Sequence, residues 1–485
     1  MSEIWRMSAV ELAAAIRRRD IGCREVMDCV LERIERLDGQ TNAFAFVDPQ
    51  AARRAADEAD RAIAADAPLG PLHGLPVSAK DLINTGGMRT AHGSRAFAGN
   101  VPAEDAEVIA RVRRAGAIVF GKTTTPELGC KILTDSPLHG TTRNPWNPER
   151  TPGGSSGGAA VATAMGFGPI ALTTDGAGSS RIPAACCGVI GLKPTLGAVP
   201  MELAADLFGG LSCIGLMARA AADLELLFPL IAGPCSRDPW TLGRGGEVAR
   251  AREPAEQGFA GLRVRWIRRM GNAALDPEVE RLALRAISLM AEAGAVIVEG
   301  PPDFDWALDA CRMLLRANQA ARHAPLLEKW RDALDPVLVQ GIEEGLSQST
   351  GQIRQAGLER SALFRRVQGL FDGADVLATP TFAATPPLAS QRADQSFQVA
   401  GGPPGSLRET WYSYTIPFNP TGHPAVSVPC GLASDGMPVG LQLVGPWHAE
   451  SLLIGLAGAL EPIIGWRRQW PALAGAPRHA TESGA

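Results

Sequence analysis

The sequence predicts an α/β protein: a single large domain built on a central mixed β-sheet with helices on both faces. Three observations lead to this prediction. Short apolar runs alternate with amphipathic helical patterns over most of the chain, as is typical of α/β folds. Hydrophobic residues make up 46% and charged residues 20% of the 485 residues, so the chain can form a large core. Neither an internal repeat nor a linker divides it.

The N-terminal region predicts three amphipathic helices. A capping box, Ser8-Ala-Val-Glu11, precedes a helix over 12–19. A second helix is expected over 24–38, ending at Gly39. Asp48-Pro49 combines an N-cap with a proline at the first helical position and opens a helix to about Ala65. These helices are expected to cover a core rather than to carry chemistry.

From residue 70 onward, the pattern changes to short strands separated by helices. Helices are expected over 105–115 and 276–294, where Gly116 and Gly294 mark the C-terminal ends. The expected strands are 75–79, 117–120, 170–174, 262–267, 295–298, 375–379, 425–429 and 438–444.

Composition excludes several classes of protein. The net charge is −4, from 47 basic and 51 acidic residues, and no basic face is evident, so we expect no nucleic-acid partner. The uncharged stretches 151–174 and 410–434 are too rich in glycine or proline for membrane helices, and no signal peptide is expected. The nine cysteines show no C-x-x-C pair and no zinc spacing, so we expect no metal or cofactor and reduced thiols in the cytoplasm.

Lysine is rare in this chain. Of the 47 basic residues only five are lysines, at positions 80, 122, 131, 193 and 329, and the remainder are arginines. An amine can lose its proton near neutral pH, whereas a guanidinium stays charged. A lysine in this chain is therefore a candidate for a role that requires a neutral base, although chance and codon bias account for any single lysine equally well.

Two glycine-serine segments, 151–158 and 175–181, are the most informative part of the sequence. A phosphate-binding loop is disfavoured because neither segment ends in Gly-Lys-Ser/Thr. Residues 153–157 match the G-x-S-x-G elbow of α/β-hydrolases, but the preceding residues 144–152 indicate a loop where that motif requires a strand. A glycine-rich connector explains the glycines but not the serines or the lysine at position 80.

The chain resembles the amidase signature family over nearly its full length. Eight motifs in order carry the resemblance: Gly74-Leu-Pro-Val-Ser-Ala-Lys-Asp81, Gly121-Lys-Thr-Thr-Thr-Pro-Glu127, Pro152-Gly-Gly-Ser-Ser-Gly-Gly158, Asp175-Gly-Ala-Gly-Ser179, Arg181-Ile-Pro-Ala184, Gly191-Leu-Lys-Pro-Thr195, Gly422-His-Pro-Ala-Val-Ser-Val-Pro429 and Gly436-Met-Pro-Val-Gly440. The resemblance implies one catalytic domain over 1–471. Its expected parts are N-terminal helices over about 1–65, a signature core over about 70–200, variable pocket segments over about 200–345 and 400–420, and a flexible tail over 472–485.

The resemblance implies a Ser–cis-Ser–Lys triad made of Lys80, Ser155 and Ser179. Ser179 would be the nucleophile, Ser155 the proton relay behind a cis peptide bond, and Lys80 the base. Amide hydrolysis needs these parts, and a hydroxyl can both donate and accept a proton. As a base near neutral pH, Lys80 must have a pKa about 3 units below its ordinary value of ~10.4, which burial among uncharged residues can produce.

The turn before the nucleophile is expected to supply the oxyanion hole through the backbone N–H groups of Gly176, Ala177, Gly178 and Ser179. Here the turn departs from the usual family pattern, because an alanine stands at 177 and a serine at 180. Asp175 and Arg181 flank it and are interpreted as a charge pair that braces the loop, the alternative being two solvated charges. Ser156, Ser180, Lys122 and Lys193 are interpreted as structural. The seven histidines have no evident partner in the sequence, which disfavours a Ser-His-Asp triad.

The expected function is hydrolysis of a carbon–nitrogen amide bond in a small molecule, an amide, anilide or carbamate, through a serine acyl-enzyme. Trp306, Met313, Leu314, Trp411, Tyr412, Tyr414 and Phe418 suggest an apolar, partly aromatic pocket and a substrate with an apolar or aromatic part. The alternative is the glutamine amidase subunit of a tRNA-dependent amidotransferase. Residues 181–184 and 210–215 differ from the motifs usual in those subunits. A homodimer remains open.

Overall fold

The computed structural model describes residues 3–242, 258–306 and 308–475. Its centre is an 11-stranded mixed sheet in the order β1-β3-β2-β6-β8-β7-β12-β13-β11-β9-β10. The strands are β1 Phe44–Val47, β2 Pro76–Lys80, β3 Ile118–Thr123, β6 Ile170–Asp175, β7 Ile190–Lys193, β8 Cys213–Ala218, β9 Arg263–Trp266, β10 Val296–Glu299, β11 Val376–Pro380, β12 Ala425–Leu432 and β13 Pro438–Val444. A separate hairpin joins β4 Asp135–Ser136 to β5 Gly140–Thr141.

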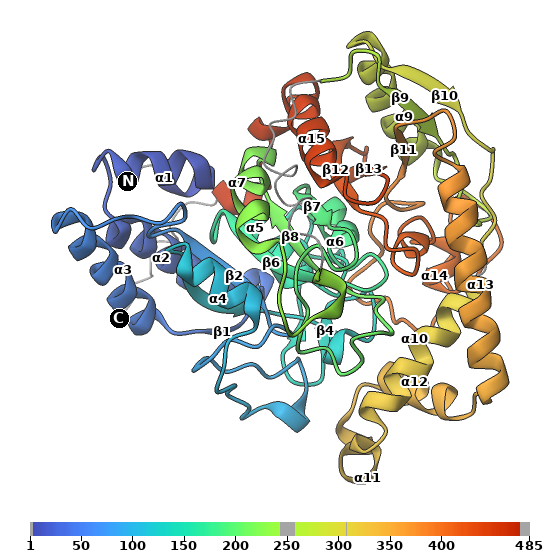
Figure 1. Ribbon diagram of the computed structural model, residues 1–485, viewed down its shortest axis with the longest axis horizontal. Helices are drawn as coiled ribbons and strands as arrows, with labels where there is room; N and C mark the ends of the chain where they lie inside the picture. The colour runs from blue at the N-terminus through green and yellow to red at the C-terminus, as the bar shows by residue number, and fades with distance from the viewer. Residues whose placement is uncertain (1–2, 243–257, 307, 476–485) are drawn as a thin grey trace, which may run out of the picture.

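Helices surround this sheet (Figure 1). They are α1 Ala9–Arg17, α2 Cys23–Thr41, α3 Pro49–Ala64, α4 Glu107–Arg114, α5 Gly157–Ala164, α6 Arg181–Cys187, α7 Ala221–Ile231, α9 Pro277–Glu292, α10 Leu308–His323, α11 Leu326–Trp330, α12 Pro336–Leu346, α13 Thr350–Gly369, α14 Leu407–Thr410 and α15 Glu450–Ile464. The predicted α/β class is confirmed. Helices α1–α3 lie at one end of the molecule, and α10, α12 and α13 form an arm at the other.

Most of the predicted elements are present, with differences at their ends. The capping box at Ser8 is formed, and α3 begins at Pro49 behind an Asp48 cap. The second helix does not stop at Gly39 but continues to Thr41, where Asn42 adopts a left-handed conformation with φ 54°. An α-helix tolerates one glycine, so Gly39 was a weak stop signal.

The first four residues of the expected flexible tail are ordered. Residues Ala472–Gly475 form a 3-10 helix, and Ala474 is buried. The carbonyl oxygen of Ala474 accepts a hydrogen bond from the buried Arg33 guanidinium at 2.9 Å. The remainder of that tail, 476–485, lies outside the described residues.

Small residues let α5 pack directly against the sheet. Every residue of this helix is buried, and its sequence is Gly-Gly-Ala-Ala-Val-Ala-Thr-Ala. A Cβ at Gly158 would lie 2.3 Å from Thr124 Oγ1 and 2.5 Å from the carbonyl oxygen of Ala43. This close approach fixes the position of the chain that enters α5, which is the first glycine-serine segment.

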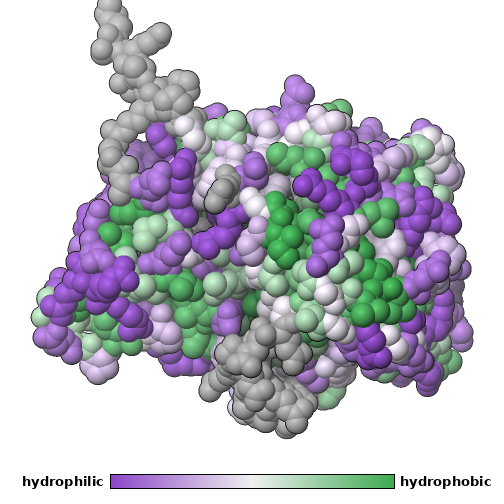
Figure 2. Space-filling view, turned by 90° about the horizontal axis from the view of Figure 1, so that it is seen from above, coloured by the Kyte–Doolittle hydropathy of each residue, from purple (hydrophilic) through white to green (hydrophobic). Residues whose placement is uncertain are grey.

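The core is one large hydrophobic cluster, with a smaller one where α12 of the arm meets Cys130. The smaller cluster is centred on Cys130, Leu334, Leu338 and Ile342. On the face shown in Figure 2, hydrophobic patches are interrupted by hydrophilic side chains. Among the described residues, no helix combines the length and the apolar character that a bilayer crossing requires.

Candidate active site

The site forms where two neighbouring strands end. Strands β2 and β6 are adjacent and parallel, with Ala79 opposite Leu172. Lys80 is the last residue of β2, and Thr174 and Asp175 end β6, so their side chains meet at one edge of the sheet. The two glycine-serine segments reach the same edge, because Ser155 stands just before α5 and Ser179 just before α6.

A chain of hydrogen bonds joins the three residues that the sequence singled out. Lys80 Nζ donates to Ser155 Oγ at 2.7 Å, and Ser155 Oγ donates to Ser179 Oγ at 3.0 Å. The peptide bond Gly154–Ser155 is cis, as the resemblance implied. Lys80 Nζ also donates to Thr174 Oγ1 at 2.9 Å, a contact that the sequence did not predict.

Burial changes the protonation of Lys80. Its side chain is completely buried, and no carboxylate lies within ion-pair distance of it among the described residues. Desolvation lowers the pKa of Lys80 to about 7, although the charge of Asp175 opposes this shift. Near neutral pH, a substantial fraction of this amine is therefore unprotonated.

Asp175 and Arg181 form a fully buried ion pair. The guanidinium donates from Nε to one carboxylate oxygen and from Nη2 to the other, both at 3.0 Å. Burial alone would raise the pKa of Asp175, but the charge and hydrogen bonds of Arg181 outweigh it and hold this pKa well below its usual range. The alternative of two solvated charges is wrong.

Three residues from the C-terminal third complete this network, and the sequence analysis did not identify them. Arg181 Nη1 donates to Gln442 Oε1 at 2.7 Å and to the carbonyl oxygen of Thr415 at 2.8 Å. Asn419 Oδ1 accepts from Arg181 Nη2 at 2.6 Å, and its Nδ2 donates to Asp175 Oδ1 at 3.0 Å. A glutamine inside the apolar strand β13 was a usable signal, because buried polar groups need partners.

The same carboxylate organises the turn before Ser179. Its two oxygens accept the N–H groups of Gly178 at 2.7 Å and Ser180 at 3.1 Å. The N–H group of Gly178 therefore points at Asp175. The backbone N–H groups of Gly176, Ala177 and Ser179 make no hydrogen bond within the described chain.

Gly178 is a position in the turn where a side chain cannot fit. Its φ is 120°, and a Cβ there would lie 2.2 Å from Thr415 Oγ1. Ala177 does not adopt a positive φ, so its Cβ is tolerated. The carbonyl oxygen of Ala177 accepts from the Thr415 hydroxyl at 2.9 Å, which holds the turn against the C-terminal segment.

Ser156 and Ser180, the serines next to Ser155 and Ser179, bond to strand β6. Ser156 Oγ donates to the carbonyl oxygen of Thr174 at 3.3 Å. Ser180 Oγ and Thr173 Oγ1 share a hydrogen bond of 2.6 Å. Both hydroxyls are thus engaged with the sheet, which agrees with their structural interpretation.

Two further lysines of the signature region, Lys122 and Lys193, bond to backbone and hydroxyl oxygens. Lys122 Nζ donates to the carbonyl oxygen of Ile83 and to Thr85 Oγ1, and Lys193 Nζ donates to the carbonyl oxygen of Pro194 at 2.9 Å. Within the described ranges, no histidine bonds to Ser155 or Ser179, and no group of three or more metal-ligating side chains converges. His479 lies outside them.

The turn of residues 126–130 covers Ser155 from the side of the arm. A Cβ built on Gly129 would lie 3.4 Å from Ser155 Oγ. The Glu127 carboxylate accepts from the Ser94 hydroxyl and from the N–H of Asp335, the residue that caps α12. Lys131 bonds to Asp335 at 2.6 Å. The helical arm is thereby attached to the turn beside the serines.

The aromatic residues proposed for the pocket lie in the core. Trp411, Tyr414 and Phe418 are completely buried, and Trp306 and Tyr412 nearly so. The Tyr414 hydroxyl donates to the carbonyl oxygen of Arg268 at 2.9 Å. Trp411 Nε1 donates to the carbonyl oxygen of Ala384 at 2.8 Å. Their polar ends thus have partners within the fold, whereas Met313 and Leu314 are only partly buried.

Comparison with known proteins identifies the family. A family model described as Amidase matches residues 25–454. An acylamidase of Rhodococcus erythropolis is 34% identical, over 96% of this chain and 97% of that protein. A glutamyl-tRNA(Gln) amidotransferase subunit of Acidothermus cellulolyticus is also 34% identical, over 95% of each chain.

Solved structures agree with this result. A bacterial aryl acylamidase of the amidase signature family superposes with a TM-score of 0.89 at 29% identity, covering 98% of this chain and all of that one. A 6-aminohexanoate cyclic dimer hydrolase gives a TM-score of 0.85 at 27% identity, covering 98% of this chain and all of that one. The chain belongs to the amidase signature family. It is an amidase, an enzyme that hydrolyses the carbon–nitrogen bond of amides.

The buried ion pair gives a stability prediction. Asp175→Asn leaves the Arg181 guanidinium buried without a counter-charge, and breaking a buried pair in this way costs about 3–5 kcal/mol. The free energy of unfolding, measured by urea denaturation at pH 7, should fall by that amount. The matched control is Asp375→Asn, which breaks the exposed Arg263–Asp375 pair and should cost less than about 1 kcal/mol. Equal losses in the two variants would contradict the assigned role of burial.

Proposed function

We propose that the chain hydrolyses a small-molecule amide through an acyl-enzyme on Ser179, with Ser155 as proton relay and Lys80 as base. The observation that carries the proposal is the continuous hydrogen-bonded path from Lys80 through Ser155 to Ser179. Such a path lets a weak nucleophile lose its proton as it attacks. Family membership supports the same assignment.

In the first half of the reaction, neutral Lys80 accepts the proton of Ser155 while Ser155 accepts that of Ser179. Both hydroxyls can reverse their hydrogen bonds, since each is a donor and an acceptor. The Ser179 oxygen attacks the amide carbonyl carbon and forms a tetrahedral oxyanion. The same path returns the proton to the amine, which leaves as the carbon–nitrogen bond breaks. Water then attacks the acyl carbon and loses a proton to the same Ser155–Lys80 path. The ester bond to Ser179 breaks, the Ser179 oxygen takes that proton back, and the acid is released.

The oxyanion would be held by backbone N–H groups of the turn 176–179. Of the four expected donors, Gly178 already donates to Asp175. Gly176, Ala177 and Ser179 remain the candidates, because their N–H groups have no partner in the described structure. In this proposal Asp175 and Arg181 act as positioning residues that orient the turn. Donors fixed in advance stabilise the developing charge without reorganisation.

We propose an acyl amide with an apolar or aromatic part as the substrate class. Support comes from the similarity to an acylamidase and to an aryl acylamidase.

The nine cysteines form no disulfide, which supports the expected cytoplasmic location. A second candidate, glutamine hydrolysis within an amidotransferase complex, is favoured only by the similarity to the amidotransferase sequences.

A substrate panel separates the two candidates. The chain alone should hydrolyse simple acyl anilides, because nothing in the proposed chemistry requires a partner. Glutamine should be turned over at least about a hundredfold more slowly. A site that takes the proposed apolar substituent would strip water from the charged α-amino and α-carboxylate groups of glutamine without replacing their hydrogen bonds. The measurement is kcat/KM by amine release for acetanilide, hexanamide and glutamine. Preference for glutamine would favour the amidotransferase role instead.

The roles of the two serines can be told apart by covalent labelling. A fluorophosphonate should label wild-type protein on Ser179, within the tryptic peptide 151–181. Ser179→Ala should abolish labelling and turnover together. Ser155→Ala should still be labelled slowly, with turnover reduced by about 10²–10⁴-fold because the proton relay is lost. Fragment ions of the labelled peptide in mass spectrometry locate the adduct. An adduct on Ser155 in wild type would show that Ser155, not Ser179, is the nucleophile. Ser156→Ala serves as the matched control and should remain active.

Activity should depend on the protonation of Lys80. The reaction needs the neutral amine, so kcat/KM should fall as pH decreases through about 7, the pKa to which burial lowers this group. Lys80→Ala and Lys80→Arg should both be inactive, because arginine remains charged. Lys131→Arg is the control and should leave the pH profile unchanged. Amide turnover close to wild type in Lys80→Ala would exclude lysine as the base.

A further inference from the structure

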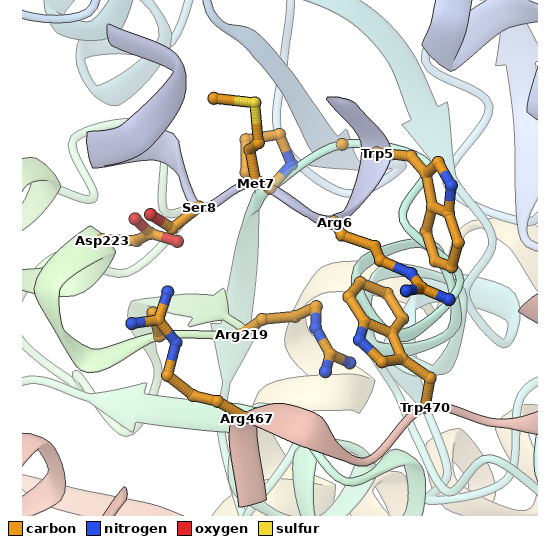
Figure 3. A pocket seen from close by; sticks show the side chains of 11 residues that line it. Trp5, Arg6, Met7, Ser8, Arg219, Asp223, Arg467 and Trp470 are labelled. Carbon is orange, nitrogen blue, oxygen red and sulfur yellow. The ribbon is translucent and has the colours of Figure 1, made fainter. Parts of the chain in front are cut away.

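A small cavity, partly open to solvent, is drawn in Figure 3. It lies away from the serine cluster, which is made of Ser155 and Ser179 with Lys80. Gly168 and Pro169, which lead into β6, and Arg219, which follows β8, are among its lining residues. The serine cluster lies at the opposite ends of these strands, where Asp175 pairs with Cys213. At ~3.3 Å per strand residue, the length of β6 separates the two places by roughly 17 Å.

Arg219 is the unusual residue of this cavity. Its guanidinium lies over the ring of Trp470 at 3.4 Å from the centroid, and Nη2 donates to the carbonyl oxygen of Gln469 at 2.9 Å. Nη1 is buried and has no hydrogen-bond partner in the described structure. Burial lowers the pKa of Arg219 to about 9. The residue as a whole is only partly buried, but its Nη1 atom is closed off from solvent. A cation in such a position without a counter-charge is costly and normally has an anionic partner.

Other charges around the cavity leave a positive balance. Figure 3 shows Arg6, Arg219 and Arg467 around it, with Trp5 and Trp470 on one side and Asp223 on the other. Arg6 and Arg467 each have a carboxylate partner, Glu3 at 2.8 Å and Glu11 at 3.3 Å. Arg219 has none within 4 Å among the residues that the structure describes.

Asp223 is the one acidic side chain that lines the cavity. Its Oδ1 accepts the N–H of Val10 in the first turn of α1, and its Oδ2 has no partner in the described structure. Burial raises the pKa of this carboxyl to about 7, so its negative charge is only partly present at neutral pH. It therefore opposes an anion in the cavity less than an exposed carboxylate would.

We propose that this cavity binds a small oxyanion, a carboxylate or a phosphate, with Arg219 as its main contact. A guanidinium offers paired N–H donors to such groups, and the indole rings of Trp5 and Trp470 can cover an apolar substituent. The bound anion would join the N-terminal segment, the β8–α7 junction and the segment around residues 466–470, which all line the cavity. The inference does not depend on the proposed hydrolytic mechanism.

Isothermal titration calorimetry on the full chain tests this site. Sodium phosphate and sodium acetate are titrated separately at pH 7, with sodium chloride at equal ionic strength as the blank. Saturable binding of phosphate alone, acetate alone or both supports the site and identifies the type of anion. Arg219→Met keeps the bulk of the side chain without its charge and should weaken binding by at least about tenfold. Arg18→Met, which removes an exposed arginine paired with Asp20, should bind as wild type does.

Two outcomes would overturn the proposal: no saturable binding of either anion to the folded wild-type chain, or equal affinity in wild type and Arg219→Met. If Arg219→Met does not fold, wild-type crystals soaked separately with arsenate and 3-bromopropanoate replace it. An anomalous peak beside Arg219 then supports the site. Peaks confined to other places, or only ordered water in the cavity, exclude it.

Discussion

The desolvation of Lys80 is the constraint on which the rest of the site depends. A lysine whose pKa falls to about 7 must be buried without an anion of its own. The uncharged stretch 151–174 provides such surroundings, and the small residues of α5 bring it close to the sheet. Asp175, the carboxylate whose charge acts on Lys80, is already bound on both oxygens by Arg181. Were that carboxylate free to pair with Lys80, the amine would stay charged.

Arg181 therefore has two effects: it keeps Asp175 from pairing with Lys80, and it sets the geometry of the turn before Ser179. By holding Asp175, it directs both carboxylate oxygens to the N–H groups of Gly178 and Ser180, which sets the shape of the turn before Ser179. Arg181 is itself held by Gln442 of β13 and by Asn419 in the segment before β12. Residues separated by more than 200 positions in the chain thus act on one turn, which explains why the site needs most of the domain.

The sequence predicted the features that depend on neighbouring residues, such as the bounds of strands and the starts of helices. The bounds of β13 and the start of α3 follow from apolar runs and caps. The sequence analysis did not predict strand β8, because the segment Ser212-Cys-Ile-Gly-Leu-Met-Ala218 has few of the β-branched residues that are typical of strands. The position of β8 between β6 and β7 depends on Gly215, where an added Cβ would lie 2.1 Å from Ser180 Oγ. Lys80, Ser155 and Ser179 were found through motifs. Asn419 and Thr415 were not, since their partners are distant in sequence, and the aromatic residues assigned to the pocket proved to be core.

The most direct test of this account is the pKa of Lys80 itself. Only five lysines are present, so a chain labelled with ¹³C at the lysine Cε gives few NMR signals, which Lys80→Arg and Lys122→Arg variants assign. Burial also lowers the pKa of Lys122, so both assignments are needed. The account predicts that the Lys80 signal titrates near pH 7 in the folded protein. A Lys80 signal that titrates near the ordinary value of ~10.4 would contradict it.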